Sequence, residues 1–265
     1  MKRMLREEFD RAVHNPRLWL ALVLSLISLA YGVIRIHSRA WVPAGYSFAD
    51  LWYFAYVGGY FPYVLPLAAA LPFADSLVVD HSEGFLAYLV MRSKYRHYLS
   101  AKFIANGLIG ALILLVPLLG LYLLSNLAAP RAIYPINAWQ PNISGRPYGV
   151  LMPLFQAHPD GFIVLVSLLA ALIGALYSNL GLAVSLALPN RYLAWGAPCA
   201  VYLLADFVAQ RTHLFGPQWS PIAATAGSVY ILNESIQSFF LNPLGVLGLT
   251  LGCILLFGQR KRTLQ

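Results

Sequence analysis

Six long apolar segments limit what this chain can fold into more than any other feature of its sequence. A helix needs about 20 mostly apolar residues to cross a bilayer, and each segment reaches or approaches that length. The segments are residues 18–36, 51–74, 103–124, 162–188, 192–209 and 240–258. Charged residues make up 11% of the chain, against about 25% in soluble globular proteins. The sequence therefore predicts an all-α integral membrane protein with six transmembrane helices, built as one transmembrane domain over residues 1–265.

The distribution of lysine and arginine predicts the orientation of these segments. If the N-terminus is cytoplasmic, thirteen of the 18 basic residues fall in cytoplasmic segments and five fall outside. The cytoplasmic loops of membrane proteins have this excess of positive charge. The sequence thus predicts a multi-pass protein with both termini in the cytoplasm. The net charge of +8 then reflects topology rather than binding to nucleic acid.

Residues 1–16, ahead of the first apolar segment, have the pattern of an amphipathic helix. Leu5 and Phe9 belong to an apolar stripe, whereas Arg6 belongs to the charged face. The pair Asn15-Pro16 ends such a helix, because the residue before a proline disfavours helical geometry. We expect this helix to lie in the cytoplasmic interface with its apolar face in the lipid. A segment that only fixes the topology is the alternative.

Residues 75–102, between the second and third apolar segments, are rich in charge. Seven of the chain's charged residues lie there: Asp75, Asp80, Glu83, Arg92, Lys94, Arg96 and Lys102. A chain that only turns around at the membrane surface needs a few residues, so this segment predicts a structured surface for a cytoplasmic partner. Asp80, His81 and Glu83 are of metal-ligand type, but adjacent ligands on a helix point apart. We therefore expect a solvated helix face there and no metal site.

The second apolar segment combines four tyrosines with several helix-breaking residues. Tyr53, Tyr56, Tyr60 and Tyr63 follow spacings of 3, 4 and 3, which places them on one helical face. The pair Gly58-Gly59 and three prolines predict kinks, which spanning helices tolerate where neighbouring helices satisfy the freed backbone. Tyr56, Tyr60 and Tyr63 are candidate residues of a substrate path. An interfacial aromatic belt for Tyr53 and Tyr56, and simple packing for Tyr60 and Tyr63, are the alternatives.

The fourth apolar segment has a stripe of small residues. Ala170, Gly174 and Ser178 recur every four positions, and such stripes allow two helices to approach closely inside a membrane. We therefore expect a tight helix contact at this face, which indicates assembly rather than chemistry.

Two longer outer segments separate the remaining spans. Residues 127–160 contain six prolines and are expected to form an irregular outer loop. Residues 210–239 contain Ser220-Pro221, a typical helix start. The apolar run after it is too short to span. We therefore expect a re-entrant or interfacial helical element before the last span.

The sequence lacks the motifs of common hydrolases and nucleotide-binding proteins. It contains no GxxxxGK[ST] phosphate loop, no HExxH zinc motif and no GxSxG nucleophile motif. Asp206 is the one acid well within an apolar segment, and acids in that position are often functional. An outer ion pair between Asp206 and Arg211 is the structural interpretation. We expect no catalytic residue, no metal site and no cofactor bound by this chain.

The charged segment also contains a short motif, namely Glu83-Gly84-Phe85 followed by Arg92, Tyr95, Tyr98 and Lys102. Together with the six spans, the amphipathic N-terminus and the re-entrant element, it resembles the permease subunits of ATP-binding-cassette transporters of the ABC type 2 exporter family. The resemblance covers the whole chain at the level of architecture and residues 83–102 at the level of the motif. Met91 stands where that family often has proline.

This resemblance implies an exporter subunit, not itself an enzyme, that is driven by a separate ATPase subunit holding ATP and Mg. Residues 75–102 would form the coupling loop, with contacts from Glu83, Gly84, Phe85, Leu89, Arg92 and Lys94. Residues 1–16 would be an elbow helix that uses Leu5, Phe9 and Arg6. A second permease subunit, identical or different, would complete the transporter. The cargo would be amphiphilic or hydrophobic, and the location a prokaryotic plasma membrane.

Three other functions remain compatible with the sequence. A secondary carrier or channel would transport without nucleotide and without an ATPase partner. An intramembrane enzyme acting on lipid would need a convergent acid, base or metal set, which Asp206 alone does not supply. A scaffold would use the charged segment to recruit a cytoplasmic protein without transporting anything.

Overall fold

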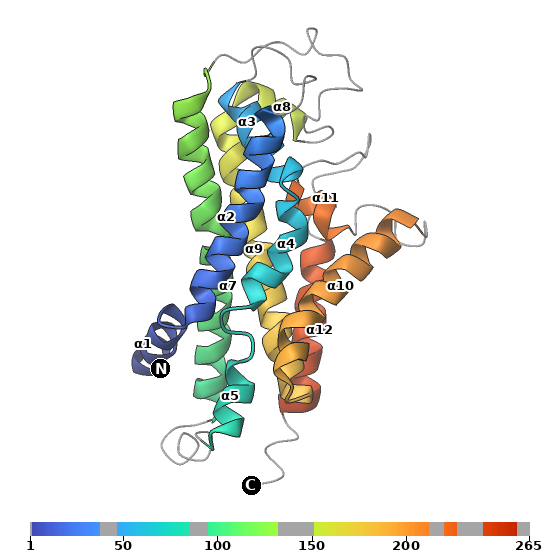
Figure 1. The fold of residues 1–265 in the computed structure, drawn as a ribbon. Helices are drawn as coiled ribbons and strands as arrows, with labels where there is room; N and C mark the ends of the chain where they lie inside the picture. Colours follow the sequence, from blue (N-terminus) through green and yellow to red (C-terminus); the bar gives the residue numbers. More distant parts are fainter. Residues whose placement is uncertain are drawn as a thin grey trace.

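The computed structural model describes residues 2–37, 47–84, 95–131, 151–211, 220–226 and 241–258, and every regular element in these ranges is helical (Figure 1). Four of the described helices are long and apolar enough to cross a membrane. They are α2 (Pro16–His37), α7 (Tyr95–Ala128), α9 (Pro159–Ala187) and α10 (Arg191–Arg211). The all-helical fold and several membrane-spanning helices of a multi-pass membrane protein are therefore confirmed.

The second and sixth predicted spans do not appear among these four. The second is divided into α3 (Phe48–Gly58) and α4 (Phe61–Ala70). The last helix, α12 (Leu241–Gly258), has 18 residues and falls in the shorter apolar class. Before it, α11 (Pro221–Ala226) begins after Ser220 as predicted, but residues 227–239 of the predicted re-entrant element lie outside the described residues.

The break in the second predicted span occurs at Gly59 and Tyr60. Tyr60 has a φ of 57°, the only positive φ of a non-glycine residue in the described ranges. Glycine is required beside it, because a Cβ on Gly59 would lie 2.2 Å from the backbone oxygen of Ser28 in α2. The Ser28 hydroxyl donates to the Gly59 carbonyl at 2.7 Å. This bond gives a partner to a backbone carbonyl at the break in the helix. Close packing on α2 therefore accompanies the interruption.

The four tyrosines are separated by this break. Tyr53 and Tyr56 are buried in α3, whereas Tyr60 and Tyr63 are 48% and 45% exposed. The prediction that all four share one helical face is wrong, because Tyr60 precedes α4 in a left-handed conformation and the helical repeat is not continuous through it.

The helices form an elongated bundle with distinct ends (Figure 1). At one end lie α1 (Lys2–Val13) and α5 (Ser76–Ser82); at the other lie the start of α3 and the short helix α8 (Met152–Ala157). We call these the α1–α5 end and the α3–α8 end. Helix α9 lies centrally and contacts α4, α7, α10 and α12. Among the described helices, α9 therefore has neighbours on several sides, whereas α2 packs on α3, α4 and α7.

The predicted small-residue contact in the fourth span is confirmed. A Cβ on Gly174 of α9 would lie 2.2 Å from Leu114 Cδ1 and 3.2 Å from the Gly110 oxygen of α7. Ala170 and Ser178, one turn to either side, are fully buried. The stripe thus forms the contact between α7 and α9.

Helix α1 packs differently from the expectation. Leu5 and Phe9 are partly buried against the hydrophobic core, and Ala12 is completely buried there. The apolar face of α1 thus packs on the protein, chiefly on α7, and not only on lipid. Hydropathy alone does not distinguish these two apolar surroundings, so the expectation of a lipid-facing stripe needs this correction.

Candidate functional site

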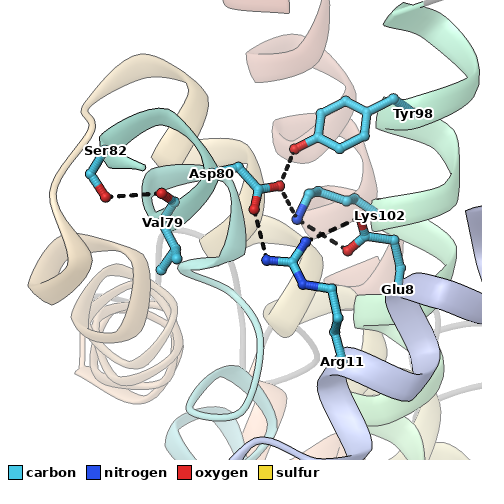
Figure 2. A network of polar contacts seen from close by, with 7 residues as sticks. All are labelled: Glu8, Arg11, Val79, Asp80, Ser82, Tyr98 and Lys102. Carbon is cyan, nitrogen blue, oxygen red and sulfur yellow. Dashed lines mark hydrogen bonds and ion pairs between the residues drawn. The ribbon is translucent and has the colours of Figure 1, made fainter. Parts of the chain in front are cut away.

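The largest group of interacting charged side chains among the described residues lies at the α1–α5 end of the bundle (Figure 2). It joins three helices that are separate in the sequence. We call it the Asp80 cluster, and it consists of Glu8 and Arg11 from α1, Asp80 from α5, and Tyr98 and Lys102 from α7.

Lys102 is at the centre of the Asp80 cluster. Its Nζ lies 2.7 Å from Asp80 Oδ2 and 3.2 Å from Glu8 Oε2. The side chains of Lys102 and Asp80 are both inaccessible to solvent. An ammonium group is tolerated in such a place only when it is paired, and here one lysine holds carboxylates from two different helices.

Arg11 and Tyr98 complete the surroundings of Asp80. Arg11 Nη2 donates to Asp80 Oδ1 at 2.8 Å, and its Nη1 donates to Glu8 Oε1 at 3.5 Å. The Tyr98 hydroxyl donates to Asp80 Oδ2. The two carboxylates and two cations balance in charge, which limits the cost of burying them together.

Local helix geometry explains how these side chains converge. Tyr98 and Lys102 are four residues apart and therefore lie on one face of α7. Glu8 and Arg11 are three apart on the face of α1 that packs against α7. Short α5 then brings Asp80 between them, as Figure 2 shows.

The cluster shifts the pKa values of Asp80 and Arg11. Burial alone would raise the pKa of Asp80, but the charge of Lys102 and the hydrogen bonds from Arg11, Lys102 and Tyr98 outweigh it and lower the pKa. Burial likewise opposes the charge on Arg11, yet the hydrogen bond and attraction from Asp80 raise its pKa. Both groups are therefore held in their charged forms.

A second set of contacts joins the start of α2 to the segment before α5. Arg17 Nη1 lies 2.5 Å from Asp75 Oδ2, and Asn15 Nδ2 donates to the Pro72 carbonyl at 2.7 Å. The Arg17 guanidinium also stacks 4.7 Å from the ring centre of Trp195 in α10. The connection between α1 and α2 is thus attached to the same region as the Asp80 cluster.

The expected solvated face at Asp80, His81 and Glu83 is only partly correct. His81 and Glu83 are exposed, but Asp80 is completely buried. The reason is the close approach of α1 and α7, whose cations surround the Asp80 carboxylate. Within the described ranges, no group of three or more metal-ligand residues occurs.

Two of the six predicted coupling residues lie within the described ranges. Glu83 and Gly84 follow α5 and are exposed, and Gly84 has a φ of 69°, which favours glycine. The other four predicted coupling residues, Phe85, Leu89, Arg92 and Lys94, lie outside the described residues.

The predicted residues of the elbow helix divide between two environments. Leu5 and Phe9 pack on the core, as described above, whereas Arg6 is exposed and lies 3.9 Å from Asp10. Arg6 therefore belongs to the solvent-facing side of α1, as the sequence pattern indicates.

The predicted substrate-path tyrosines are not equivalent. Tyr56 is fully buried, and its hydroxyl donates to the Thr225 carbonyl of α11 at 2.9 Å. Tyr60 and Tyr63 form an edge-to-face pair with ring centres 6.1 Å apart, and Tyr60 also stacks with Tyr31 of α2. Only Tyr60 and Tyr63 of the predicted three therefore contribute to an accessible surface.

Asp206 has a partner, Ser220, that sequence reasoning does not consider. The Ser220 hydroxyl donates to Asp206 Oδ1 at 2.5 Å, and Asp206 is 8% exposed. Arg211 is exposed at the end of α10. Asp206 thus holds the start of α11 against α10.

Sequence reasoning did not identify the Asp80 cluster as a unit. Such reasoning names Tyr98, Lys102 and Asp80 separately, but it does not single out Glu8 or Arg11. The available signal was Lys102 itself, a lysine at the start of an apolar helix, where an unpaired charge would be costly. What the cluster can do is mechanical, because its ion pairs fix α1, α5 and α7 to one another.

Comparisons with known proteins do not identify the chain. No model of a known protein family matches the sequence, and no curated protein matches it.

Proposed function

We propose that this chain is the permease subunit of an ATP-binding-cassette exporter, driven by a separate ATPase subunit that docks at the α1–α5 end. The observation that supports this proposal best is the Asp80 cluster. In the proposed arrangement the α1–α5 end is cytoplasmic, and both chain termini lie on that side. ATP and Mg belong to the partner, so this chain catalyses no reaction.

The cluster supports the proposal because a driven permease must transmit movement from its docking surface to its spanning helices. Asp80 lies in α5, three residues before exposed Glu83, and it is ion-paired to Lys102 in α7 at 2.7 Å. A displacement of α5 therefore displaces the base of a 34-residue helix. A loop that merely connected two spans would need no buried ion pair.

The exposed residues around the cluster support a docking surface. His81, Ser82, Glu83 and Gly84 are exposed after α5, and Arg96 and His97 are exposed in the first turn of α7. Acidic and basic groups thus lie on either side of residues 85–94. Such a mixed surface suits a protein partner, since complementary charges fix the register of docking.

The remaining features of the proposal follow from the family that the sequence resembles. Two permease subunits, identical or different, would face each other in a prokaryotic plasma membrane. The cargo would be amphiphilic or hydrophobic and would move outward. The exposed pair Tyr60 and Tyr63 would contribute to the surface that this cargo meets.

The first test is purification in mild detergent, without overexpression of any candidate partner, followed by mass spectrometry of the co-purifying proteins. A near-stoichiometric subunit with a phosphate-binding GxxxxGK[ST] loop would support the proposal. A reproducibly partner-free protein that transports without nucleotide would replace the proposal with a channel or secondary carrier.

The second test uses charge reversal in the reconstituted complex. We expect Glu83→Lys combined with Arg92→Glu to abolish stimulation of the ATPase while membrane insertion is retained. The matched control reverses one acid and one base at the α3–α8 end, Asp160→Lys with Arg131→Glu, both exposed. Normal ATPase stimulation in the Glu83 and Arg92 variant would exclude these residues from coupling.

A further inference from the structure

A groove on the side of the bundle, between α7 and α9, has a distribution of polarity that suits a ligand. Its volume is about 430 Å³. Phe103, Gly107 and Ala111 line it from α7, and Leu172, Ala175 and Asn179 line it from α9. Among the described residues that line it, Asn179 is the one polar residue and the others are apolar.

One of the two polar atoms of the Asn179 side-chain amide has a hydrogen-bond partner within the protein. Its Oδ1 accepts a hydrogen bond from Asn106 Nδ2 at 3.0 Å, and the Ser178 hydroxyl donates to Asn106 Oδ1 at 2.9 Å. Among the described residues, no hydrogen bond is formed by Asn179 Nδ2. Leaving an amide donor without a partner in hydrocarbon is energetically costly, so a hydrogen-bond acceptor is expected at this position.

The groove exists because position 107 is glycine. A Cβ on Gly107 would lie 2.8 Å from Asn179 Nδ2, so any larger residue would displace the amide. The donor and the space in front of it are therefore features of the same helix contact.

The amide lies at one end of the groove. Asn179 precedes the end of α9 at Ala187 by eight residues, a rise of about 12 Å. Near that end, Leu182 and Leu186 form one hydrophobic cluster with Leu77 of α5. Leu172 lies about two turns deeper in the membrane. The groove thus has its hydrogen-bond donor near the α1–α5 end and an apolar surface toward the membrane centre.

We infer that this groove binds an amphiphile with one acyl chain and a carbonyl acceptor next to it, which enters sideways from the inner leaflet. The carbonyl accepts from Asn179 Nδ2, and the chain lies along Ala111 and Leu172. None of the described lining residues is charged, so the charged headgroup of the amphiphile is expected outside the groove. This inference rests on the proposed function, since it identifies the bound amphiphile as cargo.

The test uses lysophosphatidylcholine with a photoreactive diazirine in its acyl chain, added to the purified permease in nanodiscs. We expect adducts within residues 103–111 and 171–179. Asn179→Leu should weaken labelling by about tenfold, the loss expected from one hydrogen bond. Because Asn179→Leu also removes an acceptor of Asn106, Ala111→Phe provides a second variant that fills the groove and leaves this bond intact.

The matched control is Ala30→Phe, the same substitution at an exposed position of α2, which should label like the wild type. Labelling that is unchanged in both groove variants would overturn the inference. A second result would also overturn the inference. If the Ala111→Cys variant forms a disulfide-linked dimer that excludes the probe, a second copy of the chain occupies the groove. A probe that unlabelled lysophosphatidylcholine cannot displace before irradiation would be a resident lipid and would overturn the assignment as cargo.

These outcomes are independent of the test of the proposed function. Labelling is measured on the permease alone, without ATPase or nucleotide. Groove labelling in a protein that has no ATPase partner would therefore contradict the proposed function and leave the binding site in place. Absence of groove labelling in a protein that has an ATPase partner would contradict the binding site and leave the proposed function in place.

Discussion

Lys102 of α7 and Asp80 of α5 form an ion pair of 2.7 Å in which neither side chain is accessible to solvent. Both partners have further contacts, Lys102 with Glu8 and Asp80 with Arg11. Each charge therefore depends on the others for its solvation. These four residues come from three helices, so the ion pairs link the position of α1 to that of α5.

Removing one partner of this pair should be far more costly than removing both. We expect Asp80→Asn to lower the free energy of unfolding by about 3–5 kcal/mol, since it leaves Lys102 and Arg11 with one carboxylate between them. Lys102→Met should cost a similar amount. In the double variant Glu8 can still pair with Arg11, so its cost should be well below the sum. Thermal unfolding in detergent, analysed as a double-mutant cycle, measures this coupling, and strictly additive costs would contradict it.

The same carboxylate predicts a dependence of stability on acid. The pKa of Asp80 is lowered from its ordinary value of 3.8, so the folded state binds this proton less readily than the unfolded state. Its contribution is complete above the unfolded-state pKa and is lost as the pH falls through the lowered folded-state pKa. Arg11, whose pKa is raised above its ordinary value, stays charged throughout this range.

Unfolding midpoints measured between pH 7 and pH 3 test this dependence. The wild type should lose stability below about pH 4, and Asp80→Asn should have a flatter profile because the titrating group is absent. An identical acid dependence in the variant would assign the effect to another carboxylate. Glu83→Gln, at an exposed position, is the control and should retain the profile of the wild type.

The sequence predicted the helices well where length and hydropathy decide the structure. The fourth predicted span, residues 162–188, corresponds to α9 at Pro159–Ala187, and the fifth, residues 192–209, corresponds to α10 at Arg191–Arg211. Gly58-Gly59 indicated a kink, and the chain breaks at Gly59 and Tyr60. These features depend on local composition, which a single sequence contains.

The candidate site was less predictable because it depends on distant contacts. Arg11 and Asp80 are 69 positions apart and meet only when α1 packs on α7 and α5 folds beneath them. The apolar stripe of α1 suits either lipid or protein, and the sequence pattern does not say which. Asp80 consequently looked solvated, although it is buried. Which of the four tyrosines are buried likewise depends on how closely α2 approaches the break at Gly59.

The glycines at this close approach should be irreplaceable. A Cβ on Gly32 would lie 2.0 Å from the Ala55 oxygen, and one on Gly59 would lie 2.2 Å from the Ser28 oxygen. Because backbone atoms cannot rotate away, Gly32→Ala and Gly59→Ala should each destabilise the protein by about 1–3 kcal/mol or more. Gly58→Ala is the matched control, since nothing lies within 4 Å of its Cβ position. A destabilised Gly58→Ala with an unaffected Gly59→Ala would contradict this packing.

The hydroxyl of Tyr56 should determine the position of α11. This helix has six residues, so the Thr225 carbonyl lies in its last turn and lacks a partner within the helix. Tyr56 supplies that partner at 2.9 Å, and Tyr56 is fully buried. Tyr56→Phe should therefore cost about 1–3 kcal/mol, because it removes a buried hydrogen bond to the Thr225 carbonyl. Tyr63→Phe, which removes the same atom from a residue that is 45% exposed, should be close to neutral.

Thermal unfolding of the two variants measures this difference, and cysteine accessibility at Ala224, introduced as Ala224→Cys, reports on α11 itself. Ala224 is 5% exposed, so a thiol-reactive maleimide should modify the cysteine slowly in the Tyr63→Phe background. Modification should be faster in the Tyr56→Phe background, where α11 has lost its attachment to α3. Equal rates in the two backgrounds, with equal midpoints, would show that the other contacts of α11, among them Ser220 with Asp206 and Thr225 with Tyr202, hold it in place without the Tyr56 hydroxyl.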